Sequence, residues 1–569
     1  MKQEIIIYTR ISWMKNIFHL LLVFIIFSVV SCNSEEKKSE TKHMIFHYNE
    51  SAGINHLDPA HASHFEDAWA SGHVFNGLVQ LNQQLEIEPC IAKKWTISED
   101  QLEYTFILRN DVYFHDHSLF PDGKGRKVIA MDFVNSFFRI MDPEEASPGS
   151  YVFKNLNREL KGMGIEAIND STLKIYLNEP QVSFIQQLTL PYCAVVPIEI
   201  VENYGSDFTR HPVGTGPFTF KKWKEGERIV LLKNPNYFEK DDKGNKLPYI
   251  DAISITFIRD KATELHQFLK GRLDMISGLQ PASMNKLLNN EGELKDEFKE
   301  EIYLQRVPWL KTDYIGILVN PDKEIVKNSL LQNRLVRQAI NFSINRREII
   351  RFLRNGIGTP ATSGFAPVGF PISASAIVQG FDYDLKKAKS LMEEARLSFG
   401  ELSNEVILTT APEYRELCEY LQRALIEIGL NPKINVVTAS VQKQMIAVYE
   451  TNFFRKSWTA DYPDAINFYQ LFYSKNKSPN GPNYTHFQNQ LYDANFEQAM
   501  QENDEQKLKE LYRNMEEIIY DEAPVIPLFY DEVIRYVRKH VTGLEANAMN
   551  QLSLKRVKID VSKQMEKAK

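Results

Sequence analysis

The sequence has few cysteines, and they follow no pattern typical of a disulfide framework or a zinc site. Only four occur in 569 residues, and no two of them have C-x-x-C spacing. Cys32 follows an apolar run, which leaves Cys90, Cys193 and Cys418 for other roles. One disulfide and one free thiol is the most that these three allow. A chain of this length can bury a large core without cross-links.

Basic tracts and catalytic motifs are also missing. The net charge is -7 and is spread along the chain, and no Lys/Arg run or RNP-like pattern is present, so we predict no nucleic-acid partner. Walker A, H-E-x-x-H, G-x-S-x-G and S-x-x-K motifs are absent as well. Gly214-Thr215-Gly216 is followed by Pro217, which lacks the N–H that a phosphate cradle needs. The sequence therefore predicts neither an enzyme nor a cofactor.

Histidines provide one candidate metal site. His56, His61, His64 and His73 lie close together in the sequence, and His61 and His64 could share a helical face. Two ligands without a third nearby are weak support for a metal ion. We favour solvent-exposed or capping histidines and predict no metal.

Only one long apolar run is present, and it lies near the start of the chain. Ile17–Val30 spans about 14 residues, fewer than the about 20 that a membrane helix needs. With Lys15 before it and Ser31 after it, the run has the layout of a secretory signal. The four residues ending at Cys32 resemble a bacterial lipobox, which implies that Cys32 is lipidated and becomes the first mature residue. An uncleaved anchor is the alternative.

Either Met1 or Met14 could be the start of translation, and Met14 gives the more usual leader length. Residues 33–43 are polar and read as a flexible tether. Order is expected from Met44. No second run approaches 18 uncharged apolar residues, so the rest of the chain is expected to be soluble.

Strand-like and helix-like segments alternate through the rest of the chain. We predict strands at 104–108, 172–177, 218–220, 229–232 and 523–530, and helices at 132–141, capped by Asp132, at 261–270 and at 334–354. Residues 356–381 are rich in Gly, Pro, Ser and Ala and predict a long ordered loop.

The clearest unit is a strand at 406–410, a helix at 414–428 ending at Gly429, and a strand at 434–437. A β-α-β unit implies parallel neighbouring strands, and the alternation as a whole indicates α/β layers. An exported chain of this kind is typically either an enzyme or a two-lobed receptor that closes on a ligand.

Nine short motifs follow one another along the chain: Asn55–Ala60, Val74–Val79, Glu88–Trp95, Tyr104–Arg109, Phe114–Asp116, Val213–Phe218, Lys233–Phe238, Arg337–Ile340 and Trp458–Asp464. In order and spacing they resemble the extracellular solute-binding proteins of family 5, over roughly residues 45 to 545. That family includes the oligopeptide- and dipeptide-binding receptors of ABC importers.

The resemblance implies an α/β fold of the two-lobed periplasmic-binding-protein type (type II), with an extra α/β domain beside lobe I. It divides the chain into a signal peptide (1–31), a tether (32–43), lobe I (44–72, 186–300 and 522–560), the extra domain (73–185) and lobe II (301–521).

It also implies where a ligand binds. In the family, the Asp of the Trp-x-x-Asp stretch pairs with the α-amino group of a peptide, and by position this is Asp461. Its neighbours Trp458, Thr459, Ala460 and Tyr462 complete the implied ligand-binding set. Arg455 matches a basic residue that meets the ligand carboxylate in some oligopeptide receptors. If 455–461 is extended, the two charges lie about 20 Å apart. The alternatives are a turn Asp at 461 and a surface salt bridge at Arg455.

We therefore expect a monomeric, lipid-anchored receptor of the cell envelope that binds peptides by hinge closure and delivers them to ABC transporter permease subunits. Relatives of this fold that bind oligosaccharides, nickel chelates or haem leave a second possibility. The aromatic residues from Trp458 to Tyr473 could stack on sugars. An exported hydrolase is the third hypothesis, and no motif supports it.

Overall fold

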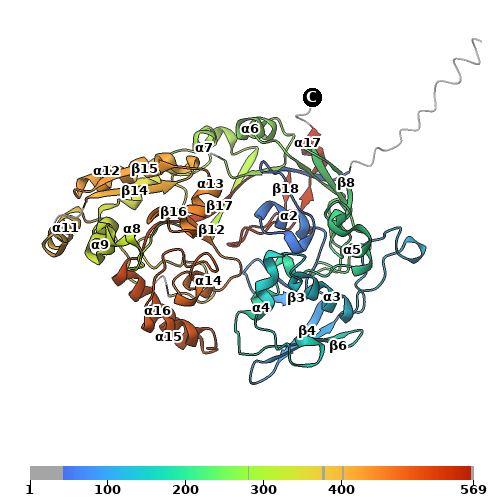
Figure 1. Cartoon of the computed structure of the whole chain (residues 1–569). Coiled ribbons are helices and arrows are strands. Elements are labelled where there is room, and N and C mark those ends of the chain that lie inside the picture. Colours follow the sequence, from blue (N-terminus) through green and yellow to red (C-terminus); the bar gives the residue numbers. More distant parts are fainter. Residues whose placement is uncertain (1–42, 280, 375–377, 400–402, 566–569) are drawn as a thin grey trace, which may run out of the picture. The chain divides into compact units, whose positions relative to one another are not determined.

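The computed structural model describes residues 43–279, 281–374, 378–399 and 403–565 (Figure 1). The predicted signal peptide, Cys32 and the predicted tether up to residue 42 lie outside these residues. No helix in the described stretches has both the length and the apolar character needed to cross a membrane.

One large mixed sheet organises the chain from Met44 onward. Its strands are, in spatial order, β15 (Asn431–Val436), β14 (Glu405–Thr410), β16 (Phe453–Thr459), β12 (Ile302–Ile317), β17 (Val525–Arg538), β11 (Met275–Ser277), β1 (Ile45–Asn49), β10 (Ala252–Thr256), β9 (Arg228–Lys233) and β8 (Phe218–Lys224), with β13 (Thr359–Pro360) also on β17.

Parallel pairs occur near both ends of this sheet. β1 pairs in parallel with β10 and β11, and β14 pairs in parallel with β15 and β16. The helix α12 (Arg415–Glu427) connects β14 to β15, and Gly429 follows it with a positive φ of 86°. The predicted β-α-β unit is therefore confirmed, including the glycine that ends its helix.

Two long antiparallel strands, β12 and β17, join the halves of the sheet. They contain 16 and 14 residues, so β17 continues well past the predicted strand end at residue 530. Along β12, Ile315 and Ile317 pack with α9, α11 and α12, whereas Leu310 and Tyr314 pack with α14 to α16 on the opposite face. This alternation gives the sheet a hydrophobic core on each side.

A separate antiparallel sheet has the order β4 (Ala92–Ile97), β5 (Glu103–Leu108), β7 (Thr172–Tyr176) and β6 (Ile165–Asn169), and α3 (Ala130–Met141) packs on it. The predicted N-cap of α3 is wrong. Ile129 occupies that position, and Asp132, in the first turn, accepts a hydrogen bond from the Ile129 N–H at 2.9 Å.

The predicted helix at 334–354 is broken into α9 (Arg334–Ser343), α10 (Arg346–Glu348) and a π-helix (Ile349–Leu353). Ile344 is extended, and Asn345 starts the next turn by accepting from the Glu348 N–H. The buried Arg346 guanidinium holds the break, because it donates to the carbonyls of Asn341 and Pro527.

The remaining helices are α2 (Phe65–Gly72), α4 (Phe184–Gln187), α5 (Ile198–Tyr204), α6 (Lys261–Leu269), α7 (Pro281–Leu287), α8 (Glu324–Lys327), α11 (Leu385–Phe399), α13 (Ala439–Ala447), α14 (Ile466–Tyr469), α15 (Gln490–Ala499), α16 (Glu505–Glu522) and α17 (Val561–Met565). Short strand pairs are formed by β2 (Val79–Leu81) with β3 (Ile87–Pro89) and by β18 (Val541–Thr542) with β19 (Lys558–Ile559). Cys90, Cys193 and Cys418 are buried free thiols, so the disulfide that the sequence allowed is not formed.

Candidate functional site

The chain leaves the large sheet immediately before Asp461. β16 ends at Thr459, and the Ala460 N–H still donates to the Leu310 carbonyl of β12 at 2.8 Å. The Asp461 side chain is exposed to solvent. It accepts a hydrogen bond from Asn467 Nδ2 at 3.3 Å, and no cation in the described part of the chain pairs with it.

Trp458 and Asn467 position this acid. The Trp458 Nε1–H donates to the backbone and side-chain oxygens of Asn467, at 2.9 Å each. These bonds orient the amide so that its Nδ2 faces Asp461. Ala460 and Tyr462 are buried in the core around α14 to α16. The residues around Asp461 therefore anchor it, while its own side chain stays open.

Asp461 lies in a concave environment. Desolvation by the surrounding protein raises the pKa of its carboxyl, against a smaller lowering by the Asn467 bond. The side chain is nevertheless open to solvent, as expected for a group that water reaches from one side only. Burial raises the pKa of Tyr151 and of Tyr192, and the Asp461 charge raises both further. Asp461 therefore faces the segments that carry these two tyrosines, Pro148–Phe153 and Pro191–Cys193.

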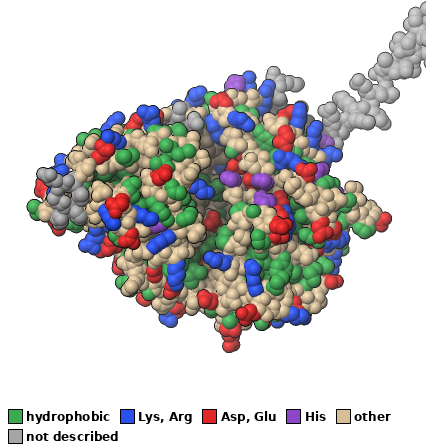
Figure 2. Space-filling model, viewed as in Figure 1, with side chains coloured by type: hydrophobic (Ala, Val, Ile, Leu, Met, Phe, Trp, Pro, Cys, Tyr) green, Lys and Arg blue, Asp and Glu red, His purple; other side chains and the backbone are tan. Residues whose placement is uncertain are grey.

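A cavity of about 420 Å³ is lined by Pro463 and Asp464, which follow Asp461 in the sequence. Its walls come from widely separated parts of the chain: Gln84, Leu85, Glu86, Ile87 and Gln186 on one side, and Gly369, Pro371, Ile372, Pro463 and Asp464 on the other. The predicted long loop supplies three of these residues. Figure 2 shows a hollow in this face of the molecule, with His side chains gathered at its edge.

Arg455 is paired within the protein. Its side chain is 6% exposed and forms an ion pair with Asp313 of β12, which is 1% exposed. The Tyr414 ring covers the guanidinium, whose carbon lies 3.2 Å from the ring centroid. Burial lowers the pKa of Arg455 to about 9, although the Asp531 charge opposes this. Arg455 therefore forms a salt bridge, as in the alternative considered from the sequence. That alternative placed the salt bridge on the surface, whereas the pair with Asp313 is buried.

Further cations on these strands are also paired. Lys311 Nζ lies 2.7 Å from Asp531 and 3.5 Å from Asp313, and Arg354 forms an ion pair with Asp531. Burial opposes ionisation of Asp531, but the charges of Lys311 and Arg354 outweigh it and lower the Asp531 pKa to about 2. Sequence reasoning missed this network. The sequence did contain one signal of it: Lys311 and Asp313 lie two residues apart in an otherwise largely apolar strand.

The aromatic residues considered for sugar stacking are largely core residues. Phe468, Tyr469 and Phe472 are fully buried. Tyr462 is also buried, and its hydroxyl lies within hydrogen-bonding reach of Gln187 and Ser183. These rings fill the interior and offer no open face to a sugar.

The histidines do not combine as the sequence allowed. His61 Nε2 lies 2.9 Å from Glu145, whereas His64 lies 3.8 Å from Asp67. Asp58, His61 and Glu145 do bring ligand atoms within 4.8 Å of one another. Arg139, however, pairs with both Asp58 and Glu145, and its charge occupies the place where a cation would bind.

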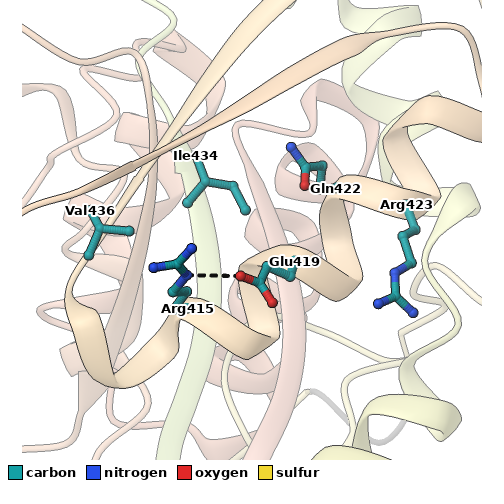
Figure 3. Close-up of a pocket in the computed structure, with 6 residues that line it drawn as sticks. All are labelled: Arg415, Glu419, Gln422, Arg423, Ile434 and Val436. Carbon is teal, nitrogen blue, oxygen red and sulfur yellow. Dashed lines mark hydrogen bonds and ion pairs between the residues drawn. The ribbon is translucent and has the colours of Figure 1, made fainter.

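A second cavity, of about 540 Å³, lies between α12 and the edge strand β15 (Figure 3). Arg415, Glu419, Gln422, Arg423, Ile434 and Val436 line it. Arg415 Nε donates to Glu419 Oε1 at 2.9 Å, and Gln422 donates to the Pro432 carbonyl. It presents no enclosed, unpaired charge comparable to Asp461.

Residues 86–480 match the model of the bacterial extracellular solute-binding proteins, family 5 Middle. The match covers more than half of the chain, and the chain therefore belongs to this family of solute-binding proteins.

Among its relatives are the dipeptide-binding protein of Escherichia coli (strain K12), 25% identical over 508 residues, and the glutathione-binding protein GsiB of Salmonella choleraesuis (strain SC-B67), 25% identical over 493 residues. Each alignment covers 86% of this chain and 89% of the relative.

The fold is also similar to solved structures. The ABC transporter-associated periplasmic binding protein DppA from Helicobacter pylori, in complex with peptide STSA, aligns with a TM-score of 0.73 and 25% identity over 92% of this chain and 99% of that protein. HbpA2 from Haemophilus parasuis has a TM-score of 0.75 at 24% identity, covering 91% of this chain and 100% of that protein. The predicted two-lobed fold is confirmed.

Proposed function

We propose that this chain is an extracytoplasmic receptor that encloses peptides between two lobes and delivers them to an ABC transporter. The observation that carries the proposal is the state of Asp461, an enclosed carboxylate without a cationic partner among the described residues. Closure of the lobes over this carboxylate would remove its water, and it would then require a counter-charge, which the ammonium of a free peptide supplies. The peptide bound to the DppA relative supports this ligand class.

The open edge of β16 provides a place for the peptide main chain. β12 pairs with β16 along Phe453–Thr459, whereas β14 pairs with it only at Phe454. Since the Ala460 N–H bonds to β12, the alternation of antiparallel hydrogen bonds turns the backbone groups of Ser457 and Thr459 to the other side. An extended peptide would add there as a strand, without selecting its side chains.

In this proposal the division into lobe I (44–72, 186–300 and 522–560), extra domain (73–185) and lobe II (301–521) is retained. Asp461 and Thr459 contact the ligand, and Trp458, Ala460 and Tyr462 hold that segment in place. Arg455 is assigned to Asp313 and not to the ligand. Hinge bending would close the lobes, and the ligand would stabilise the closed state.

The proposal also includes Cys32 as the lipid anchor that keeps a non-catalytic receptor at the cell envelope. Membership of an extracellular family supports export of the chain. The lipobox-like sequence that ends at Cys32 supports lipidation.

Calorimetric titration of unmodified and N-acetylated short peptides tests the ligand class. Asp461→Asn keeps the shape of the side chain and removes its charge, so unmodified peptides should bind at least 30-fold more weakly. Glu419→Gln, in the α12 cavity, is the matched control and should bind normally. Equal affinity for acetylated peptides, or full affinity in Asp461→Asn, would contradict the proposal. Mass spectrometry of ligand that co-purifies would reveal a sugar, haem or nickel chelate instead.

A further inference from the structure

Acidic and basic side chains near the proposed peptide site differ in whether they are paired within the protein. Among the described residues, Asp461 has no cation beside it, whereas the cations on strands β12 and β16 that share a face with Arg455 pair with acids of the chain itself. A peptide carries one charge of each sign at its ends. The site therefore offers an open acid for the ammonium and no equally open base for the carboxylate.

We propose that Asp313 takes the place of a ligand carboxylate at Arg455, so that the receptor recognises the amino end of a peptide and not its carboxyl end. The inference rests on the proposed function and specifies which peptides the same site accepts. It makes Asp313 a specificity-determining residue.

The geometry of the pair supports this role. Arg455 is two residues from Ser457, and Ser457 lies directly opposite Asp313 in the β12–β16 ladder. The two charged side chains share one face of the sheet, since side chains two residues apart in a strand point the same way. The Asp313 carboxylate reaches the guanidinium diagonally from the neighbouring strand, and both side chains are almost completely buried.

Tyr414 closes the remaining face of this ion pair. It follows β14 and places its ring over the guanidinium of Arg455. A ligand carboxylate could approach the guanidinium only by moving the ring aside and by competing with the charge of Asp313. Displacing Asp313 would leave a buried carboxylate without its main partner, which is costly. The pair is therefore stable against competition by a peptide end.

Other cations nearby do not replace Arg455. Lys456 follows it in β16 and points to the opposite face, where its Nζ lies 4.7 Å from the centroid of the Tyr484 ring. Lys311 and Arg354 share Asp531. Together with Arg455 they make three cations facing two acids, Asp531 and Asp313, so one positive charge is in excess. Lys311 is therefore the residue through which a ligand anion would act if the inference were wrong.

The inference predicts how ligands are discriminated. Peptides with a free carboxylate and the same peptides with a C-terminal amide should bind wild-type protein with dissociation constants within threefold of each other. Acetylation of the amino end should weaken binding by at least 30-fold. A preference of more than threefold for the free acid would overturn the inference. If no peptide binds, the proposed function fails, and this inference fails with it.

The variant Asp313→Asn removes the internal anion and keeps the side-chain shape. Arg455 then has a vacant counter-charge position, so free-acid peptides should gain at least a tenfold preference over amides. Glu532→Gln is the control, since Glu532 of β17 forms an ion pair with Arg306 at 2.8 Å. In this variant the ratio of the dissociation constants of amides and free acids should stay near one. A folded Asp313→Asn protein with an unchanged ratio would overturn the inference. So would a Lys311→Met protein that loses affinity for free acids but not for amides.

Discussion

Trp458 holds Asn467 through two hydrogen bonds of 2.9 Å, and Asn467 in turn donates to the carboxylate of Asp461. The orientation of the Asp461 carboxylate therefore depends on an indole N–H whose hydrogen bonds both go to Asn467. A residue that acts only through another is a positioning residue, and its removal should change affinity more than stability.

The substitution Trp458→Phe tests this chain of contacts. It removes the donor and keeps an aromatic ring in the core, so we expect peptide affinity to fall about three- to tenfold. The free energy of unfolding should fall by only about 1 kcal/mol, the usual net contribution of one hydrogen bond. Titration calorimetry and denaturant unfolding measure the two effects, with Trp95→Phe on β4 as control. Unchanged affinity would show that Asn467 holds its orientation without Trp458.

Glu516 should make stability depend on pH. Burial raises its pKa to about 7, against the lowering effects of the Ala366 and Phe365 N–H groups and the Tyr469 hydroxyl. Between the unfolded value near 4.5 and about 7, the folded state binds more protons than the unfolded state. Stability from this group is therefore full at low pH and is lost as the pH rises through this window.

The substitution Glu516→Gln isolates that contribution. Other buried groups also make stability depend on pH in this range. Burial lowers the pKa of His73 to about 3, so that only the unfolded state takes up this proton as the pH falls below about 6.5. We therefore compare melting temperatures of the variant and wild type at each pH. The melting temperature of the variant should rise relative to that of wild type between pH 4.5 and 7. Above pH 7 the difference between the two melting temperatures should stay constant. A constant difference across the range would mean that Glu516 is already ionised in the fold.

Gly216 is required by a close backbone approach. A Cβ built there would lie 2.5 Å from the carbonyl carbon of Val74 and 2.6 Å from the His73 oxygen. Gly216→Ala should therefore destabilise the protein by about 1 to 3 kcal/mol, as overpacking usually does. Gly72, with open space around it, is the matched control, and Gly72→Ala should be close to neutral. Thermal unfolding of both variants checks this, and equal melting temperatures would contradict the steric argument.

Cys32 should determine where the protein is found. In the native bacterium, Cys32→Ser should move it from the membrane fraction to the soluble extracytoplasmic fraction, and labelled palmitate should no longer be incorporated. Ser31→Ala, next to the same site, should leave the protein membrane-bound. Fractionation followed by immunoblotting measures the distribution. A Cys32→Ser protein that stays in the membrane would favour the uncleaved anchor.

Much of the fold was predictable because its signals are local. The β-α-β unit around 406–437 combines a strand, an amphipathic helix and a glycine within one short stretch. The choice of Asp461 followed from resemblance to the family, and its role in binding a ligand stays a prediction. The steric role of Gly214 and Gly216 could not be predicted, because it depends on Val74, far away in the sequence.

The sequence could not predict which side chains from distant strands pair with one another. Asp313 and Arg455 meet only after β12 and β16 pair, and neither residue signals the other. The helix break before Arg346 could not be predicted for the same reason. It is stabilised by a hydrogen bond from Arg346 to the carbonyl of Pro527, which belongs to the distant strand β17. Charged residues in apolar strands are the positions where such long-range pairing should be expected.

The placement of β17 also bears on how the chain reaches its final form. This strand lies between β12 and β11 in the sheet, yet it is the last long strand in the sequence. The two halves of the sheet can therefore join only after residue 538 has left the ribosome. Contacts between residues so far apart in sequence form slowly. A chain with this topology therefore stays incompletely assembled until its last long strand has been synthesised.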